Sequence, residues 1–181
     1  MANRHLSRTV AMQSLYEWDF NERVRPLLDI TDYNVKQFAP GMDDPQFIFE
    51  LIKGVSEHLA EIDGLIVQTA PEWPLDQITV VDRNILRLGI YELMFAKQVP
   101  PKVAINEAVE LGKGFGGESS GKFINGVLGT LYKNLPEDER KRGEEEVVEK
   151  KEKKGEAMPE LPAEEPVEEV TEEPPTEEIK E

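Results

Sequence analysis

Apolar residues recur at helical spacing along most of the segment from Leu6 to Asn134, and this periodicity limits the fold more than any other feature. Apolar side chains three and four residues apart line one face of a helix, whereas a half-buried strand alternates apolar and polar residues. No stretch of this segment alternates for long enough to predict a strand. The sequence therefore predicts an all-α fold of about seven helices.

Turn residues divide this segment into separate helices. Asp44 is placed to cap a helix that has Pro45 as its first residue, and PEWP at 71–74 ends a helical pattern. The predicted helices are Leu6–Phe20, a short piece at Ile30–Phe38, a long helix from Pro45 to Thr69, Thr79–Ala96, a helix that opens at Pro100 and Pro101 and reaches the glycines at 114–117, and Ser119–Asn134.

Charge separates the chain into two parts. Residues 137–181 hold 19 of the 37 acidic residues and 8 of the 21 basic ones, and they include no aromatic residue. Such a segment cannot bury enough apolar surface to offset the entropy lost on ordering. We therefore expect a helical domain at 1–136 and a disordered acidic tail at 137–181. The tail is either a solubilising appendage or a competitor for the basic face of the domain.

Neither catalytic chemistry nor a membrane span is indicated. The 181-residue chain has no cysteine, only two histidines and no HExxH or GxSxG motif, so we expect no enzyme activity, metal or cofactor. His58 lies beside acidic residues and is expected to face solvent. The N-terminus lacks the apolar segment of a secretion signal, and no apolar run approaches 18 residues. These features favour a cytoplasmic protein that does not insert into a membrane.

The stretch GGESSGKF at 116–123 resembles a phosphate-binding loop without meeting its requirements. Gly116, Gly121 and Lys122 fit the G-x-x-x-x-G-K pattern, but Phe123 stands where a magnesium-binding hydroxyl is needed. A true loop of this kind also lies between a strand and a helix, and here two helices are predicted. Free amides at the start of the last helix, with Lys113 and Lys122 near, still favour a phosphate, which could belong to a polynucleotide.

The first helix carries a local positive charge. Arg4 and Arg8 are four residues apart, His5 borders the same face, and the first sixteen residues contain no acid. Cations beside an exposed aromatic ring such as Phe115 would suit single-stranded RNA, because charges hold phosphates and rings stack on unpaired bases. A solvated helix end with no ligand is the alternative interpretation.

Two long stretches resemble one known family. VDRNILRLGIYELMF at 81–95 and VPPKVAINEAVELGKGFGGESSGKFINGVLGTLYK at 99–133 are similar to the transcription antitermination factor NusB family. The resemblance implies two small helical bundles and no catalysis. It also implies binding to the boxA sequence of nascent ribosomal RNA leader transcripts, with the ribosomal protein NusE as partner, inside an antitermination complex on RNA polymerase.

The resemblance also implies which residues form each face. The RNA face would comprise Arg4, His5, Arg8, Lys113, Phe115, Ser119, Lys122 and Phe123. The NusE face would comprise Tyr16, Asp76, Asp82 and Arg83. Some of these residues could have a structural role instead. Phe123 and Tyr16 suit the core, and Arg83 suits an ion pair with an acid on a neighbouring helix, as does Arg87, which belongs to neither face. A structural role is also expected for Glu107.

The N-terminus departs from the family pattern, and two further alternatives remain open. Family members often begin with more arginines than NRHLSR, so the RNA affinity of this chain alone is expected to be modest. The rival function is a protein–protein adaptor that keeps the NusE face and does not bind RNA. The free protein is either a monomer or a homodimer that hides the RNA face.

Overall fold

The computed structural model describes residues 2–42, 44–96 and 98–142, and within these ranges every regular element is a helix. The predicted all-α fold is confirmed. The elements are α1 (Ala2–Phe20), α2 (Leu27–Phe38), α3 (Gln46–Glu57), α4 (Leu59–Thr69), α5 (Val80–Ile90), the π-helix η1 (Tyr91–Phe95), α6 (Pro101–Gly116), α7 (Glu118–Asn134) and α8 (Glu137–Arg140). Most of the predicted tail lies outside the described residues, so the division into a domain and a tail stays a prediction.

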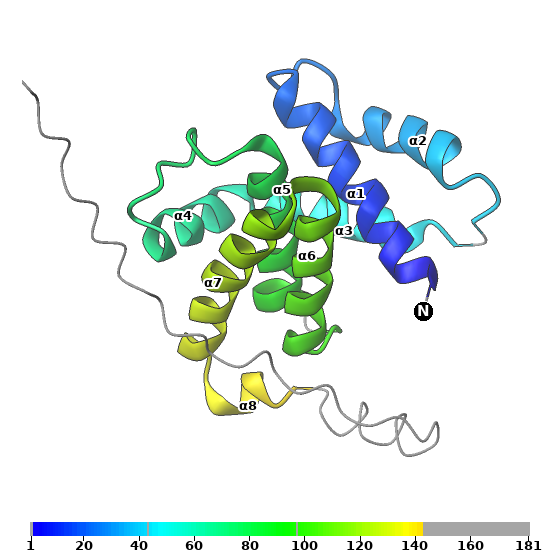
Figure 1. Cartoon of the computed structure of the whole chain (residues 1–181). Helices are drawn as coiled ribbons and strands as arrows, with labels where there is room; N and C mark the ends of the chain where they lie inside the picture. Colours follow the sequence, from blue (N-terminus) through cyan, green and yellow to red (C-terminus); the bar gives the residue numbers. More distant parts are fainter. Residues whose placement is uncertain (1, 43, 97, 143–181) are drawn as a thin grey trace, which may run out of the picture.

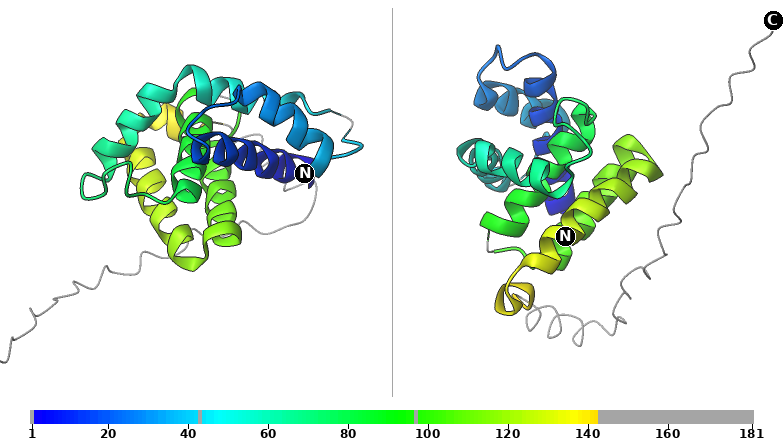
Figure 2. Two further views of the ribbon diagram at one scale, coloured as in Figure 1. Left: turned by 90° about the horizontal axis from the view of Figure 1, so that it is seen from above. Right: turned by 90° about the vertical axis from the view of Figure 1, so that its left-hand side faces the viewer.

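The helices form two groups that share one apolar core (Figure 1). α1 contacts α2 and α3 in the first group and α5 in the second, while α6 and α7 form the most extensive helix pair. Figure 2 shows α6 and α7 side by side, joined by a short turn. Leu15, Ile52, Ile85 and Leu128 are fully or almost fully buried in the common core. The inward stripes of the sequence therefore define one continuous interior.

Local sequence signals explain where the helices begin. The Thr79 side chain caps α5 by accepting a hydrogen bond from the Asp82 amide at 3.1 Å. The Asp44 carboxylate accepts a hydrogen bond from the Gln46 amide at 2.9 Å, directly before α3. Pro101 is the first residue of α6, where its missing amide hydrogen costs nothing.

Two predicted helices are wrong in detail. The helix expected from Pro45 to Thr69 is broken at His58, which separates α3 from α4. His58 does not simply face solvent, because its ring stacks on Phe95 with the centroids 4.2 Å apart. The helix expected at Thr79–Ala96 changes to a π-helical turn at Tyr91, where the Tyr91 ring lies directly against Gly54. Contacts between distant segments therefore override the local helical period.

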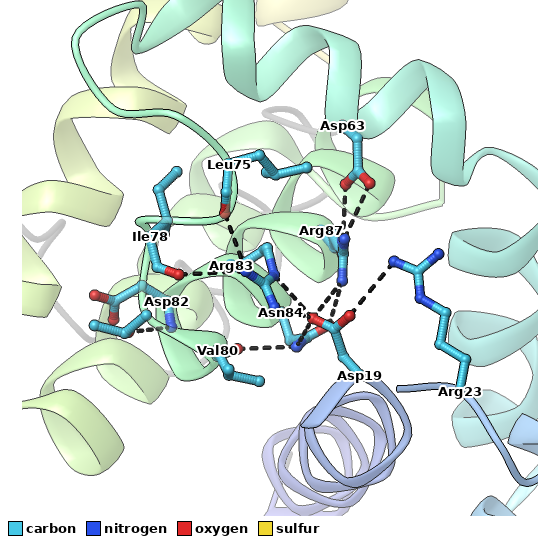
Figure 3. A network of polar contacts seen from close by, with 11 residues as sticks. Asp19, Arg23, Asp63, Leu75, Ile78, Val80, Asp82, Arg83, Asn84 and Arg87 are labelled. Atoms are coloured by element: carbon cyan, nitrogen blue, oxygen red, sulfur yellow. Dashed lines mark hydrogen bonds and ion pairs between the residues drawn. The ribbon is translucent and has the colours of Figure 1, made fainter. Parts of the chain in front are cut away.

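A buried polar network holds α1, α4 and α5 together (Figure 3). The Asp19 carboxylate accepts hydrogen bonds from Arg83 and Arg87 at 2.8 Å and from Asn84 at 3.0 Å. Arg87 also donates two hydrogen bonds to Asp63, at 2.7 and 3.0 Å. Burial acts to raise the pKa of Asp19, but the charges of Arg87 and Arg83 and the donated hydrogen bonds outweigh it and hold the pKa below its ordinary value. The expected ion pairs of Arg83 and Arg87 are confirmed.

Candidate nucleic-acid interface

The turn between α6 and α7 exposes a cluster of cationic and aromatic side chains. Gly117 forms the turn at φ +87°, a backbone conformation that favours glycine. The two helices approach closely at Gly121, where a Cβ atom would come within 2.7 Å of the Lys113 side chain. The side chains of Phe115, which is 45% exposed, and of Lys122, which is also exposed, therefore extend from two closely packed helices.

The chain around GGESSGKF does not form a phosphate-binding loop of the nucleotide-hydrolase kind. Gly116 ends one helix and Glu118 begins the next, so the stretch lacks the strand that precedes such a loop. Ser120 and Gly121 are buried in the first turns of α7, and Phe123 is half-buried. The predicted placement of the glycines between two helices is confirmed, and the turn can offer charges, hydroxyls, aromatic rings and the first backbone amides of α7 to a ligand.

The lysines of this turn are available to an anion. Lys122 is exposed and has no ion pair within the described part of the chain. Lys113 is also exposed, and among the described residues it pairs only with Glu110 at 3.2 Å, a surface contact three residues away on the same helix. Exposed pairs of this kind contribute little, so a phosphate could displace Glu110 at small cost. Ser119, which lies between the two lysines in the sequence, is also exposed.

The predicted cations of α1 are in three different environments. Arg4 is exposed, and its guanidinium lies 3.9 Å from the centre of the Phe47 ring. His5 is exposed, with Nδ1 3.0 Å from a Glu107 carboxylate oxygen. Arg8 is only 3% exposed. Arg4 is therefore the cation of α1 that is placed to meet an external anion directly.

Arg8 forms a buried ion pair with Glu92 of the π-helix. Its Nε and NH2 donate to the two Glu92 carboxylate oxygens at 2.8 and 2.7 Å, and its NH1 donates to Glu107 at 3.4 Å. Burial lowers the pKa of Arg8, but the hydrogen bonds and charges of Glu92 and Glu107 outweigh it and raise the pKa above its ordinary value. Burial raises the pKa of Glu92, against the opposing effect of Arg8. The expected structural role of Glu107 is confirmed.

The four residues predicted for the NusE face do not share one environment. Tyr16 is half-buried and stacks on Phe20, which is 61% exposed, while Asp76 is exposed. Arg83 is occupied by Asp19 and by the carbonyl oxygens of residues 75 and 78. Asp82 is 7% exposed, and Figure 3 shows its carboxylate on the side of α5 away from Asp19 and α1. The role of these four residues stays a prediction.

Three residues near the interface were not predicted from the sequence. Glu92 anchors Arg8, Phe47 lies under Arg4, and Trp73 contacts Phe123 edge-on with the ring centroids 6.1 Å apart. A single acid in the apolar run IYELMF could have signalled Glu92, since a buried acid needs a cationic or hydrogen-bonding partner. Nothing local to Phe47 or Trp73 identifies their partners.

The part of the chain that the structure describes contains neither a metal-binding cluster nor a membrane-spanning helix. No group of three or more His, Cys, Asp or Glu side chains in it could hold a metal ion. None of the described helices is both long and apolar enough to cross a bilayer.

The described helices and the α6–α7 turn define an all-helical domain in which the glycine stretch joins two helices. Residues 5–133 match the model of the NusB family, and the chain belongs to that family. A relative from Desulfatibacillum aliphaticivorans, named transcription antitermination protein NusB, is 40% identical over 140 residues. This match covers 77% of the chain and 96% of the relative. A relative of the same name from Dehalococcoides mccartyi strain 195 is 39% identical over 142 residues, covering 78% and 98%.

Solved structures give the same result. NusB from T. maritima is 35% identical, with a TM-score of 0.68 over 75% of this chain and 95% of that one. A structure described as antitermination factors NusB and NusE in complex with dsRNA is 32% identical, with a TM-score of 0.67 over 75% and 99%. The suspected family and the non-enzymatic class are confirmed: the protein is a NusB-family antitermination factor.

Proposed function

We propose that this antitermination factor binds the boxA RNA of nascent ribosomal RNA leader transcripts together with NusE. The pair then joins the RNA polymerase antitermination complex in the cytoplasm. The observation that supports this most strongly is that Lys113, Phe115 and Lys122 are all exposed on the two helix ends that meet at the α6–α7 turn.

The chemistry of the turn suits a single strand. The lysines supply charge for phosphates, and the exposed Phe115 ring offers a face on which an unpaired base can stack. A stacked base contributes about 1–3 kcal/mol, and each phosphate contact adds an attraction that salt weakens. Ser119 can donate a hydrogen bond to a phosphate or sugar oxygen. These groups recognise an unpaired polynucleotide better than a free nucleotide, since they are spread along a surface.

α6 connects this turn to the cations of α1. Glu107 on α6 holds His5 and Arg8, and Lys113 lies six residues later on the same helix, about 9 Å along its axis. Arg4 and the turn thus lie within a few nucleotides' reach of each other. We assign Arg8 to this face as a positioning residue, because its buried pair with Glu92 fixes the first turns of α1.

The comparisons support the choice of partners. A family member has been solved with NusE and RNA, and we extend both partners to this chain. Around Tyr16, the exposed ring of Phe20 adds apolar surface suited to a protein partner. We keep Tyr16 and Asp76 as residues of the NusE face. Arg83 would contribute to this face indirectly, because its hydrogen bond holds the Asp19 side chain of α1 in place.

Substitutions at the turn test this proposal against the adaptor alternative. We expect Lys122→Ala to weaken boxA binding and to reduce the slope of log affinity against log salt by about 0.7, the value for one lost contact to a single strand. Phe115→Ala should weaken binding about tenfold or more with little change in slope. NusE binding should persist in both variants.

Lys36→Ala provides a matched control. Lys36 is 69% exposed on α2 and, within the part of the chain that the structure describes, pairs only with Asp32, so its loss removes the same charge away from the turn. If Lys122→Ala and Phe115→Ala bind boxA as tightly as Lys36→Ala does, the turn is not the RNA face. If the unaltered protein binds NusE and no RNA at low salt, the adaptor function is correct.

A further inference from the structure

The chain leaves the described structure at a fixed point on the α6–α7 pair. Arg142, the last described residue, donates hydrogen bonds from NH2 to the carbonyl oxygens of Leu93 and Val99, at 3.1 and 3.2 Å. α6 begins two residues after Val99, and Lys113 lies about 18 Å along its axis. Figure 1 shows α8 at this same end of the pair, opposite the turn. Residues 143–181 therefore start roughly 20–30 Å from the turn.

The charge of these remaining residues is unevenly distributed. Residues 143–154 hold five acids and four bases, so their charges nearly cancel, whereas residues 155–181 hold eleven acids and one base. We call residues 155–181 the acidic segment. Adjacent glutamates recur in it every four or five residues, at 164–165, 168–169, 172–173 and 177–178. The acidic segment thus carries negative charge along its length, as an RNA backbone does.

The near-neutral residues 143–154 have the length that the distance to the turn requires. Twelve residues reach at most about 40 Å when fully extended. A flexible chain of that length averages about 20 Å between its ends. A linker whose average length is close to the span gives its binding segment the highest effective concentration, on the order of millimolar. The acidic segment therefore begins within reach of the turn.

The exposed cations of the RNA face lack strong carboxylate partners of their own. No described carboxylate lies within ion-pair distance of Arg4, whose guanidinium lies over the Phe47 ring. Lys122 likewise has no such partner in the described part of the chain, and Lys113 has only its surface pair with Glu110. A negatively charged segment can therefore bind these cations without breaking a buried ion pair.

We propose that the acidic segment lies across Arg4, Lys113 and Lys122 when no RNA is bound, and that RNA displaces it. The proposal rests on the proposed function and adds regulation of the same face. The acidic segment contains no aromatic residue, so it can replace the phosphates of a strand but not the base stacked on Phe115. Its contact is electrostatic and is weakened by salt.

Carbodiimide coupling of the full chain without RNA tests the contact itself. The reagent joins a lysine amine directly to a carboxylate that touches it, and peptide mass spectrometry identifies the pair. We expect Lys113 and Lys122 to couple to the acidic segment at low salt several-fold more often than Lys36, an exposed lysine of α2. The coupling should disappear when salt shortens the screening length to a few ångströms. Coupling that is absent, or equally frequent at Lys36, would refute the contact.

The affinity for boxA RNA in the presence of NusE tests the regulation. A full-length variant carries Glu→Gln at the eight positions of the four glutamate pairs, which preserves the length of the chain. A segment that binds its face with a Kd of about 0.1–1 mM, at millimolar effective concentration, lowers RNA affinity about two- to tenfold. The glutamine variant should gain this factor at low salt and nothing at high salt.

A double-mutant cycle separates this contact from general repulsion between RNA and an acidic protein. Repulsion does not depend on the lysines of the turn, whereas the contact does. The gain from the glutamine variant should therefore fall by at least half when it is combined with Lys113→Ala and Lys122→Ala. It should persist when it is combined with Lys36→Ala, which removes a cation away from the turn.

The outcomes distinguish this inference from the proposed function. If the glutamine variant binds boxA no more tightly than the unaltered chain, or gains equally with and without the two lysines, the acidic segment does not regulate the face and the proposed function stands. If neither chain binds RNA at low salt with NusE, the proposed function fails, and the regulatory role fails with it whatever the coupling shows.

Discussion

Replacing Asp19 with alanine should destabilise the fold strongly, because this buried carboxylate joins α1 to three residues of α5. Asp19→Ala removes the acceptor for Arg83, Arg87 and Asn84. Hydrogen bonds to charged groups contribute about 1.5–3 kcal/mol each, so three would sum to more than about 4 kcal/mol if nothing compensated. Arg87 keeps both bonds to Asp63, which places the loss near 3 kcal/mol, at the lower end for breaking a buried ion pair.

Urea unfolding at neutral pH measures this free energy, with Asp32→Ala as control. Asp32 forms an exposed pair with Lys36, and its loss should cost less than about 0.5 kcal/mol. If Asp19→Ala lowers the free energy of unfolding by no more than the control does, the network does not stabilise the fold and the reasoning is refuted.

The stability of the Asp19→Ala variant relative to the unaltered protein should also depend on pH. The pKa of Asp19 is lower in the folded chain than in the unfolded chain. Its ionised form therefore contributes stability that is fully present above the unfolded pKa of about 3.9 and is lost as pH falls through the folded pKa. The difference between the unaltered protein and Asp19→Ala should be constant from pH 6 to 8 and shrink below about pH 4. A difference that grows on acidification would contradict the assigned shift.

Three further substitutions test individual contacts. Glu92→Gln should cost about 2–4 kcal/mol in urea unfolding, because it leaves the buried guanidinium of Arg8 beside a neutral amide; a loss below about 1 kcal/mol would mean that the pair is not formed. Gly54→Ala should cost at least about 2 kcal/mol by thermal unfolding, since the new Cβ overlaps the Tyr91 ring, and an unchanged Tm would contradict this packing. Gly117→Ala should cost about 1–3 kcal/mol, because Gly117 has φ +87° and ψ −175°, a region that almost only glycine adopts, and a stabilised variant in the same assay would refute the assigned turn.

Helical periodicity predicted the all-α fold because each helix buries one face against a common core. It identified the stripes that contain Ile52, Ile85 and Leu128, all of which are buried. It did not reveal the break at His58, whose ring stacks on Phe95 from a segment 37 residues later. Local spacing carries no information about such contacts.

The candidate site was predictable in its composition and less so in its geometry. Residue types near the glycine turn indicated cations and an exposed ring, and Phe115 and Lys122 are both exposed. The helical position of Arg8 showed which face it shares with Arg4, but could not show that Glu92 buries it. Family resemblance groups Asp82 with Tyr16, and spacing alone could not show that its carboxylate lies close to Gly116 of the turn.

The affinity of the full chain for boxA RNA and for a scrambled RNA of equal length, each measured with NusE across a salt series, tests the central claim most directly. We expect boxA to bind at least about tenfold more tightly at every salt concentration, and both affinities to fall as salt rises, because phosphate contacts supply the nonspecific part of binding. Equal affinities for the two RNAs, or binding that is independent of salt, would contradict the account.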